Sequence, residues 1–279
     1  MSGSSNLSNI ERQEQIVQLL SRQKRVTVND LCEAFSISKA TARRDLEVLA
    51  SQGKIQRVHG GAILVSSAPP EMPILQRQSE QAEEKRQIGI AAAQLVSDGS
   101  TVFLGSGSTV LEVARNLRDR RNLTVVTNSL PVINIFADVQ DITLVVIGGL
   151  FRKSELSFIG HLTEQALREI NVDQVIMGAR AISLTHGLTN DYLPETMTDR
   201  AIIQIGRRVI LVVDHTKFGR ISTAFLAPLD AIHVVVTDSR TPRSFCEGLE
   251  ARGIQVIRAG SERTEKGRVE EGGEEPGPL

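Results

Sequence analysis

The sequence predicts two domains: a small helix-rich one that ends in a β-hairpin, and a larger one built on a mostly parallel α/β sheet. Three observations predict this division. Helical periodicity dominates residues 1–65, the next five residues (Ser-Ser-Ala-Pro-Pro) have the composition of a linker, and short β-branched runs then alternate with amphipathic stretches. We therefore expect a first domain over 1–65, a linker over 66–80, an α/β domain over 81–260 and a disordered tail over 261–279.

The composition limits the classes of protein to which the chain can belong. Hydrophobic residues make up 41% of the 279 residues, which is enough for packed cores. No apolar run approaches the roughly 20 residues that span a bilayer, and the polar start of the chain does not read as a signal peptide. We expect a soluble, cytoplasmic protein with no membrane partner. Cys32 and Cys246 stand far apart, which predicts buried thiols and no disulfide, metal site or cofactor.

The first domain has the element order of a winged helix-turn-helix. Thr27 and Asp30 form a capping pattern for the second helix, Ser38 can cap the third, and His59-Gly60-Gly61 is a hairpin turn. The expected elements are helices over Glu11–Leu20, Thr27–Phe35 and Ser38–Gln52, then strands over Lys54–Val58 and Ala62–Val65.

The third helix has the pattern of a helix that reads DNA. At about 100° per residue, Ala42, Leu46 and Leu49 form one buried stripe, and Arg43 and Arg44 lie away from it. Recognition helices contact base edges in the major groove with their early residues, where an arginine fork can bond both acceptors of guanine. The alternative is an ordinary solvated face on which Asp45 or Glu47 pairs with the arginines. The order of the elements favours DNA reading.

The candidate DNA-contacting residues form two groups. Those expected near base edges are Lys39, Thr41, Arg43 and Arg44. Those of the turn and the wing, better placed for phosphates, are Ser36, Ser38, Lys54, Arg57 and His59. The charge distribution agrees, because residues 1–65 hold nine Lys and Arg against six Asp and Glu, and the rest of the chain holds 23 against 27.

The second domain alternates strands with helices. Most of the strands are near-continuous Val/Ile/Leu runs, as expected when helices cover both faces of a parallel sheet. The expected strands are Thr101–Leu104, Leu123–Thr127, Ile142–Ile147, Gln174–Met177, Val209–Val213, Ile232–Thr237 and Ile254–Arg258. The expected helices are Glu84–Val96, Thr109–Leu117, Pro131–Ala137, Leu162–Ile170, Glu195–Ile205 and Pro242–Ala251.

A glycine- and serine-rich loop, Gly105-Ser106-Gly107-Ser108-Thr109, lies between the first of these strands and a helix. Glycines let the backbone approach an anion, and successive N–H groups at a helix N-terminus stabilise phosphate. The loop is neither a Walker loop, since no Gly-Lys-Ser/Thr follows, nor a dinucleotide loop, since the third glycine is missing. It predicts either a phosphate site or a tight turn without a ligand.

Other polar segments follow other strands, at the sheet edge where open α/β sheets bind ligands. Thr127-Asn128-Ser129 could hold ligand hydroxyls, and Gly148-Gly149 marks either a close approach to a ligand or a turn. Lys217 offers a point charge for phosphate, and Asp214 either caps its turn or orients the lysine. Each segment alone is more commonly a turn or a cap. Together, and with the polar loop Gly187–Asn190 and Glu195, they predict a pocket.

These residues resemble the DeoR family of bacterial transcription regulators. Glu11–Ala62, above all Ser38–Leu46, is similar to the family's helix-turn-helix, although the family has Ile or Val at Ala42. Glu84–Asp238 carries the polar segments in the same order as the family's sensor domain, whose fold is similar to ribose-5-phosphate isomerase. The resemblance implies a site for phosphorylated sugars or related metabolites. It also places Glu195 and Lys217 near the isomerases' acid/base and substrate-binding groups, although family members generally do not catalyse.

The chain departs from the family's pattern over Gly178–Ser183, where many relatives have Gly-Ile-Asp. Arg180 adds a charge there. It predicts either a doubly anionic ligand or an ion pair with Asp191 or Glu195, and we prefer the ion pair.

We expect a transcription regulator, by family habit a repressor of carbohydrate-metabolism genes, controlled by a small phosphorylated sugar or related metabolite. Such proteins bind double-stranded operator DNA as homo-oligomers, usually dimers or tetramers. The alternative is a sugar-phosphate isomerase with an accessory DNA-binding domain, for which Glu195, Asp191 and Lys217 would be the acid/base set. The sequence offers no isomerase-like motif, so it assigns no catalytic residue.

Overall fold

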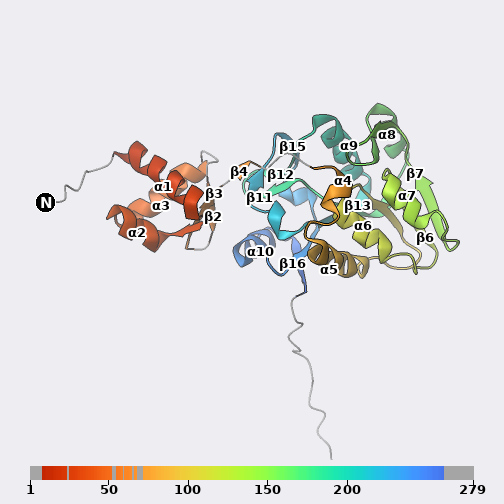
Figure 1. Ribbon diagram of the computed structural model, residues 1–279, viewed down its shortest axis with the longest axis horizontal. Helices are drawn as coiled ribbons and strands as arrows, with labels where there is room; N and C mark the ends of the chain where they lie inside the picture. Colours follow the sequence, from red (N-terminus) through yellow and green to blue (C-terminus); the bar gives the residue numbers. More distant parts are fainter. Residues whose placement is uncertain are drawn as a thin grey trace, which may run out of the picture.

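The structure is a computed structural model that describes residues 8–23, 25–51, 55–58, 60–64, 66–67 and 72–260 (Figure 1). Lys54, His59 and the predicted tail over 261–279 lie outside the described residues. Within the described part of the chain, no helix is long and apolar enough to cross a membrane.

The N-terminal domain has the predicted order of helices and a hairpin. Its elements are α1 (Asn9–Gln23), β1 (Arg25–Thr27), α2 (Val28–Phe35), α3 (Lys39–Ser51), β2 (Ile55–Val58) and β3 (Gly61–Leu64). The capping box is present, because the Asp30 N–H donates to Thr27 Oγ1 (3.1 Å) and the Thr27 N–H donates to Asp30 Oδ2 (2.7 Å). The sequence analysis did not predict β1, which pairs antiparallel with β3 and extends the wing to a three-stranded sheet in the order β1-β3-β2.

The N-terminal domain has a small core of its own and one buried ion pair. The predicted stripe Ala42, Leu46 and Leu49 is fully buried, against α1 and β2. Beside this core, Arg12 of α1 holds Asp45 of α3 with two hydrogen bonds, from Nε to Oδ2 (2.7 Å) and from Nη2 to Oδ1 (3.2 Å). The hydrogen bond that the Arg12 guanidinium donates to Asp45 raises the pKa of Arg12. The ion pair therefore fixes the orientation of α3 relative to α1.

The segment between the domains is partly structured. Strand β4 (Ser66–Ser67) pairs in parallel with β14 (Arg220–Ile221) of the α/β domain. Helix α4 (Ile74–Arg77) packs on that domain as well: both of its end residues are buried, and the Ile74 N–H donates to Ser154 O (2.8 Å). Residues 72–77, which the composition assigned to a linker, are thus attached to the α/β domain.

The α/β domain is organised around a seven-stranded sheet in which every neighbouring pair is parallel, as the alternation of strands and helices predicts. In spatial order the strands are β17 (Gln255–Ala259), β16 (Val234–Asp238), β13 (Gly206–Val212), β10 (Val172–Met177), β5 (Thr101–Leu104), β6 (Leu123–Thr127) and β7 (Ile142–Val146).

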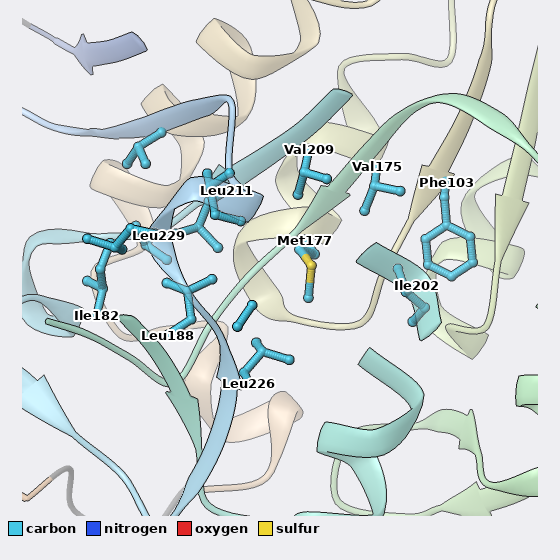
Figure 2. Close-up of a cluster of buried hydrophobic side chains, with 14 of the residues drawn as sticks. Phe103, Val175, Met177, Ile182, Leu188, Ile202, Val209, Leu211, Leu226 and Leu229 are labelled. Atoms are coloured by element: carbon cyan, nitrogen blue, oxygen red, sulfur yellow. The ribbon is translucent and has the colours of Figure 1, made fainter. Parts of the chain in front are cut away.

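Helices cover both faces of the sheet, as parallel strands require. Side chains of α5 (Ala82–Ala93), α6 (Ser108–Arg115) and α7 (Leu130–Phe136) form one core with the sheet. On the opposite face, a second core joins the sheet to α8 (His161–Leu167), α9 (Leu193–Gln204) and α10 (Arg243–Glu250). Figure 2 shows part of the second core, to which Phe103 of β5, Met177 of β10 and Ile202 of α9 contribute.

Two small antiparallel sheets lie in segments for which the sequence analysis predicted no strand. One is the hairpin of β8 (Leu150–Arg152) and β9 (Ser157–Ile159). The other has the order β11 (Ala181–Ser183), β12 (Gly187–Asn190) and β15 (Ala224–Ala227). Both sheets border the polar segments that follow the central strands.

Candidate DNA-binding face and ligand cleft

The early part of α3 presents polar and basic side chains to solvent. Lys39, Arg43 and Arg44 are exposed, and Thr41 is half-buried. The buried Asp45 is held by Arg12, and Glu47 pairs with Arg57, so the pairing that would make the α3 arginines an ordinary solvated face is not among the described ion pairs. This geometry leaves the arginine heads on the surface of the helix, as DNA reading requires.

The predicted phosphate contacts surround this helix. Ser36 is exposed and ends α2 in the left-handed conformation. Ser38 caps α3, because its Oγ accepts a hydrogen bond from the Thr41 N–H (3.1 Å). Arg57 of β2 pairs with Glu47 (2.9 Å), and both side chains are largely exposed. Surface pairs of this kind contribute little stability, so Arg57 can exchange its partner for a phosphate.

A polar cleft, whose empty space is about 810 Å³ when the adjoining open solvent is included, lies at the carboxyl edge of the sheet. It is lined by the loop after β5, the start of α6, β12, α9 and η1 (His215–Lys217). Eight predicted ligand residues line it: Gly105, Ser106, Gly107, Ser108, Thr109, Arg180, Glu195 and Lys217. The fold therefore brings together most of the polar segments that sequence reasoning selected.

The glycine- and serine-rich loop forms one wall of the cleft at the N-terminus of α6. Gly107 has a φ of +126°, a backbone conformation that a side chain would strain, which explains the glycine. Ser108 and Thr109 begin the helix and are buried in the cleft wall. A helix N-terminus offers N–H groups that have no partner within the helix, so this wall is suited to an anion.

Lys85 of α5 reaches the cleft, and the sequence analysis missed it. Its side chain is buried and donates from Nζ to Arg77 O (2.5 Å). Burial lowers the pKa of Lys85, and the nearby Asp214 carboxylate opposes this shift. The signal was present in the sequence, because Lys85 stands three and four residues before the buried Ile88 and Gly89 of the helix.

The loop after β13 brings Lys217 to the same cleft. Asp214 caps this turn, because its Oδ1 accepts a hydrogen bond from the Thr216 N–H (2.8 Å). Of the two roles left open for Asp214, the cap is therefore present. The His215 N–H also donates to the buried Asp238 (2.7 Å), and after Lys217 the Gly219 N–H donates to Ile182 O (2.9 Å). The loop that carries Lys217 is thus anchored on both sides.

Arg180 makes one of the predicted ion pairs. Its Nε lies 3.4 Å from Asp191 Oδ2, and its backbone N–H donates to Asn190 Oδ1 (3.1 Å). Glu195 pairs instead with Arg152 of the β8–β9 hairpin. A second ion pair, between Arg77 of α4 and Glu155, joins the turn of the same hairpin to the cleft. Sequence reasoning missed Arg77, Arg152 and Glu155, because these contacts form only in the folded chain.

Four predicted ligand residues lie elsewhere. The polar triplet after β6 holds β9: Asn128 Nδ2 donates to Phe158 O (2.8 Å), Thr127 Oγ1 bonds Leu104 O (2.6 Å), and Ser129 forms a bridge with Ser157. Gly149 packs on α8, where a Cβ would collide with Thr163 Oγ1. The described lining of the cleft includes none of the four, so their positions are explained by packing.

The charges in the cleft nearly cancel. Its described lining contains four cationic side chains and five carboxylates, so net attraction does not select an anion. The cations are Arg77, Lys85, Arg180 and Lys217, and the carboxylates are Glu80, Glu155, Glu195, Asp199 and Asp214. Selection of an anion would therefore depend on the positions of the hydrogen-bond donors in the cleft. No group of three or more His, Cys, Asp or Glu residues suited to a metal ion is found among the described residues.

A winged helix-turn-helix ahead of a larger α/β domain with a polar cleft defines the class of the protein, a DNA-binding transcriptional regulator with a C-terminal sensor domain. Comparison with known proteins agrees. Residues 12–68 match the family described as the DeoR-like helix-turn-helix domain, and residues 80–239 match the DeoR C terminal sensor domain. The chain belongs to the DeoR family.

Several characterised regulators are similar to this chain over most of their length. The transcriptional repressor AccR of Agrobacterium fabrum is 38% identical over 83% of this chain and 90% of its own. The glycerol-3-phosphate regulon repressor of Escherichia coli is 36% identical over 88% and 97%. Among solved structures, ribose 5-phosphate isomerase A of Methanocaldococcus jannaschii is 20% identical, covers 50% of this chain and 55% of its own, and has a TM-score of 0.38, too low to support an argument.

Proposed function

We propose that this protein is a repressor that binds operator DNA through α3 and the wing, and that a phosphorylated sugar or related metabolite in the cleft controls it. The observation that carries the proposal is the convergence of the Gly105–Thr109 loop, Lys85 and Lys217 on one cleft, in a chain that also exposes Arg43 and Arg44. The names of its relatives AccR and the glycerol-3-phosphate regulon repressor support repression. The proposed division is a DNA-binding domain over 1–65, a linker over 66–80 that packs in part on the next domain, a sensor domain over 81–260 and a tail over 261–279.

The cleft supports recognition of an anion bearing hydroxyl groups. The N-terminus of α6 supplies backbone donors for a phosphate, and Lys217 supplies a charge on the anchored loop opposite. Asn190 and Asp199, which are joined by a 2.8 Å hydrogen bond, offer partners for hydroxyls. A small phosphorylated sugar has both kinds of group.

Regulation is favoured over isomerase chemistry by the state of the candidate acid/base groups. Glu195 is held by Arg152 and Asp191 by Arg180. A general acid or base must be within reach of the proton that it transfers, and Asp191 is not part of the described lining of the cleft, so the predicted acid/base set does not come together there. We propose no catalytic residue, and we propose that the chain acts on DNA as a homo-oligomer.

The test is binding of the purified protein to DNA from upstream of its own gene, measured by fluorescence anisotropy at fixed salt with a panel of sugar phosphates. We expect tight, salt-sensitive binding that one compound shifts by roughly 5–150-fold. Arg44→Ala removes the proposed bidentate base contact, worth about 1–3 kcal/mol, so it should weaken binding by roughly 5–150-fold. Lys217→Ala should keep DNA binding and lose the response to the sugar phosphate.

Arg207→Ala is the matched control for both variants. It removes the same charge from a highly exposed position of the α/β domain, outside the cleft and far in sequence from α3, so neither measurement should change. Unchanged affinity in Arg44→Ala would remove α3 from base reading. An unchanged response in Lys217→Ala would misplace the ligand. A protein that binds no DNA at any salt and consumes sugar phosphates would be an enzyme.

A further inference from the structure

One face of the α/β domain collects exposed apolar side chains. Among the described residues, thirteen large hydrophobic side chains are exposed, and seven of them lie on or next to β8, α8, α9 and β15. Phe151 of β8 is the least exposed of the seven, and the other six form the face. These six are between 42% and 68% exposed, and we call them the α9 face: Leu150, Leu162, Tyr192, Leu193, Met197 and Phe225.

Contacts between the elements make this face continuous. At one end, the Arg200 guanidinium lies 5.9 Å from the centre of the Phe225 ring and donates to Met197 Sδ (3.5 Å). At the other end, the Arg152 guanidinium lies 4.4 Å from the centre of the Tyr192 ring.

The start of α8 lies between these two ends of the α9 face. The Gly160 N–H donates to Thr198 Oγ1 of α9 (2.9 Å), so Leu162 comes next to this helix. In the β8–β9 hairpin, Leu150 lies opposite Ile159, the residue before Gly160. Figure 1 shows α8 and α9 side by side at the same end of the domain.

The size of the α9 face fits a protein interface. Half-exposed side chains of this size offer roughly 100 Å² each, or roughly 600 Å² together, which is at the upper limit of what monomeric proteins expose in one patch. Interfaces are about 57–65% apolar, so this area corresponds to about 900–1,000 Å² per partner, above the roughly 800 Å² of a standard interface. Tyr, Phe, Met and Arg, which gather here, are the residue types that interface cores favour.

We propose that the α9 face is the surface on which a second copy of this chain docks. Each chain offers one α3, whereas helix-turn-helix regulators read two half-sites with a twofold dimer. A twofold interface uses the same patch on both partners, so a single apolar face is sufficient. This inference rests on the proposed function for the need to pair two reading helices. It also joins the dimer contact to the cleft, because α9 carries Glu195 and Asp199 on its cleft side.

The test is the mass of the full-length protein, measured by sedimentation equilibrium over nanomolar to micromolar concentrations. Met197→Glu and Leu193→Glu place a charge in the α9 face, and both positions are exposed in a helix that glutamate favours, so the fold should persist. Each change removes roughly 100 Å² of apolar contact from both copies, and the dissociation constant of the dimer should rise by at least about 100-fold. Ile90→Glu, the same change at an exposed site on α5, should leave it unaltered.

Circular dichroism of each variant checks that the chain is folded. A tetramer that falls to a dimer in the α9 variants, but not in Ile90→Glu, would support the proposal as well as a dimer that falls to a monomer. A wild-type protein that is monomeric at micromolar concentration would overturn it, as would folded α9 variants that keep the wild-type mass. A dimer that depends on the α9 face but binds no DNA would refute the proposed function and leave this inference standing.

Discussion

Asp45→Ala should unfold the DNA-binding domain selectively. The change leaves the Arg12 guanidinium buried beside the core of that domain without its carboxylate partner. Removing one member of a buried ion pair costs about 3–5 kcal/mol, and the remaining hydrogen bond from Arg12 Nη2 to Asn9 Oδ1 (2.8 Å) favours the lower value. A domain of this size has only about 3–9 kcal/mol of stability, so the loss lowers its Tm by roughly 12 °C or more.

Differential scanning calorimetry of the full chain measures this effect, because the N-terminal core is separate from the two cores of the α/β domain. We expect the transition of the DNA-binding domain to fall and that of the α/β domain to stay. Glu47→Ala is the matched control: its pair with Arg57 is largely exposed and should contribute less than about 1 kcal/mol. A Tm of the DNA-binding domain within about 2 °C of the wild type in Asp45→Ala would refute the reasoning.

Two further changes test the cleft and its surroundings. Burial lowers the pKa of Lys85 in the folded protein, so the folded chain binds this proton less tightly than the unfolded chain, whose lysine has a pKa near 10.5. Lys85→Met should therefore raise the Tm. The increase should be largest at pH values below the lowered pKa of Lys85 and should disappear as the pH approaches 10.5. An increase that becomes larger as the pH rises would contradict this reasoning. Gly149→Ala should lower the free energy of unfolding of the α/β domain in urea by about 1–3 kcal/mol, because the Cβ of the new alanine would collide with Thr163. An unchanged free energy of unfolding would show that α8 can move away from this Cβ.

The strands of the central sheet could be predicted because each carries its own signal. Leu123–Thr127 and Thr101–Leu104 are short runs of apolar and β-branched residues, and the structure gives them the predicted bounds. The β8–β9 hairpin and the β11-β12-β15 sheet have strands of three or four residues, too short for a periodic pattern. β15 joins β12 from more than 30 residues away, and no local signal marks that pairing.

The candidate cleft was predictable to the extent that its residues follow strands. The Gly105–Thr109 loop and Lys217 end parallel strands, and parallel strands bring such ends to one edge. The fact that a polar residue follows a strand did not show whether it lines the cleft or packs within the domain. Asn128 looks the same in sequence but bonds Phe158 of β9, 30 residues away. Arg77 and Glu155 are 78 residues apart, so only the folded chain shows that they form a pair.

The pairing of β4 with β14 limits how large a structural response the protein needs. Strand β4 belongs to the segment that follows the DNA-binding domain. Strand β14 consists of the two residues directly after Gly219, at the end of the loop that carries Lys217. A strand pair of this length has very few hydrogen bonds, each with a net contribution of about 0.5–1.5 kcal/mol. Coupling energies between distant sites are of the same order, about 1–3 kcal/mol. Making or breaking this one short pair is therefore energetically sufficient for control, and neither core of the α/β domain has to repack.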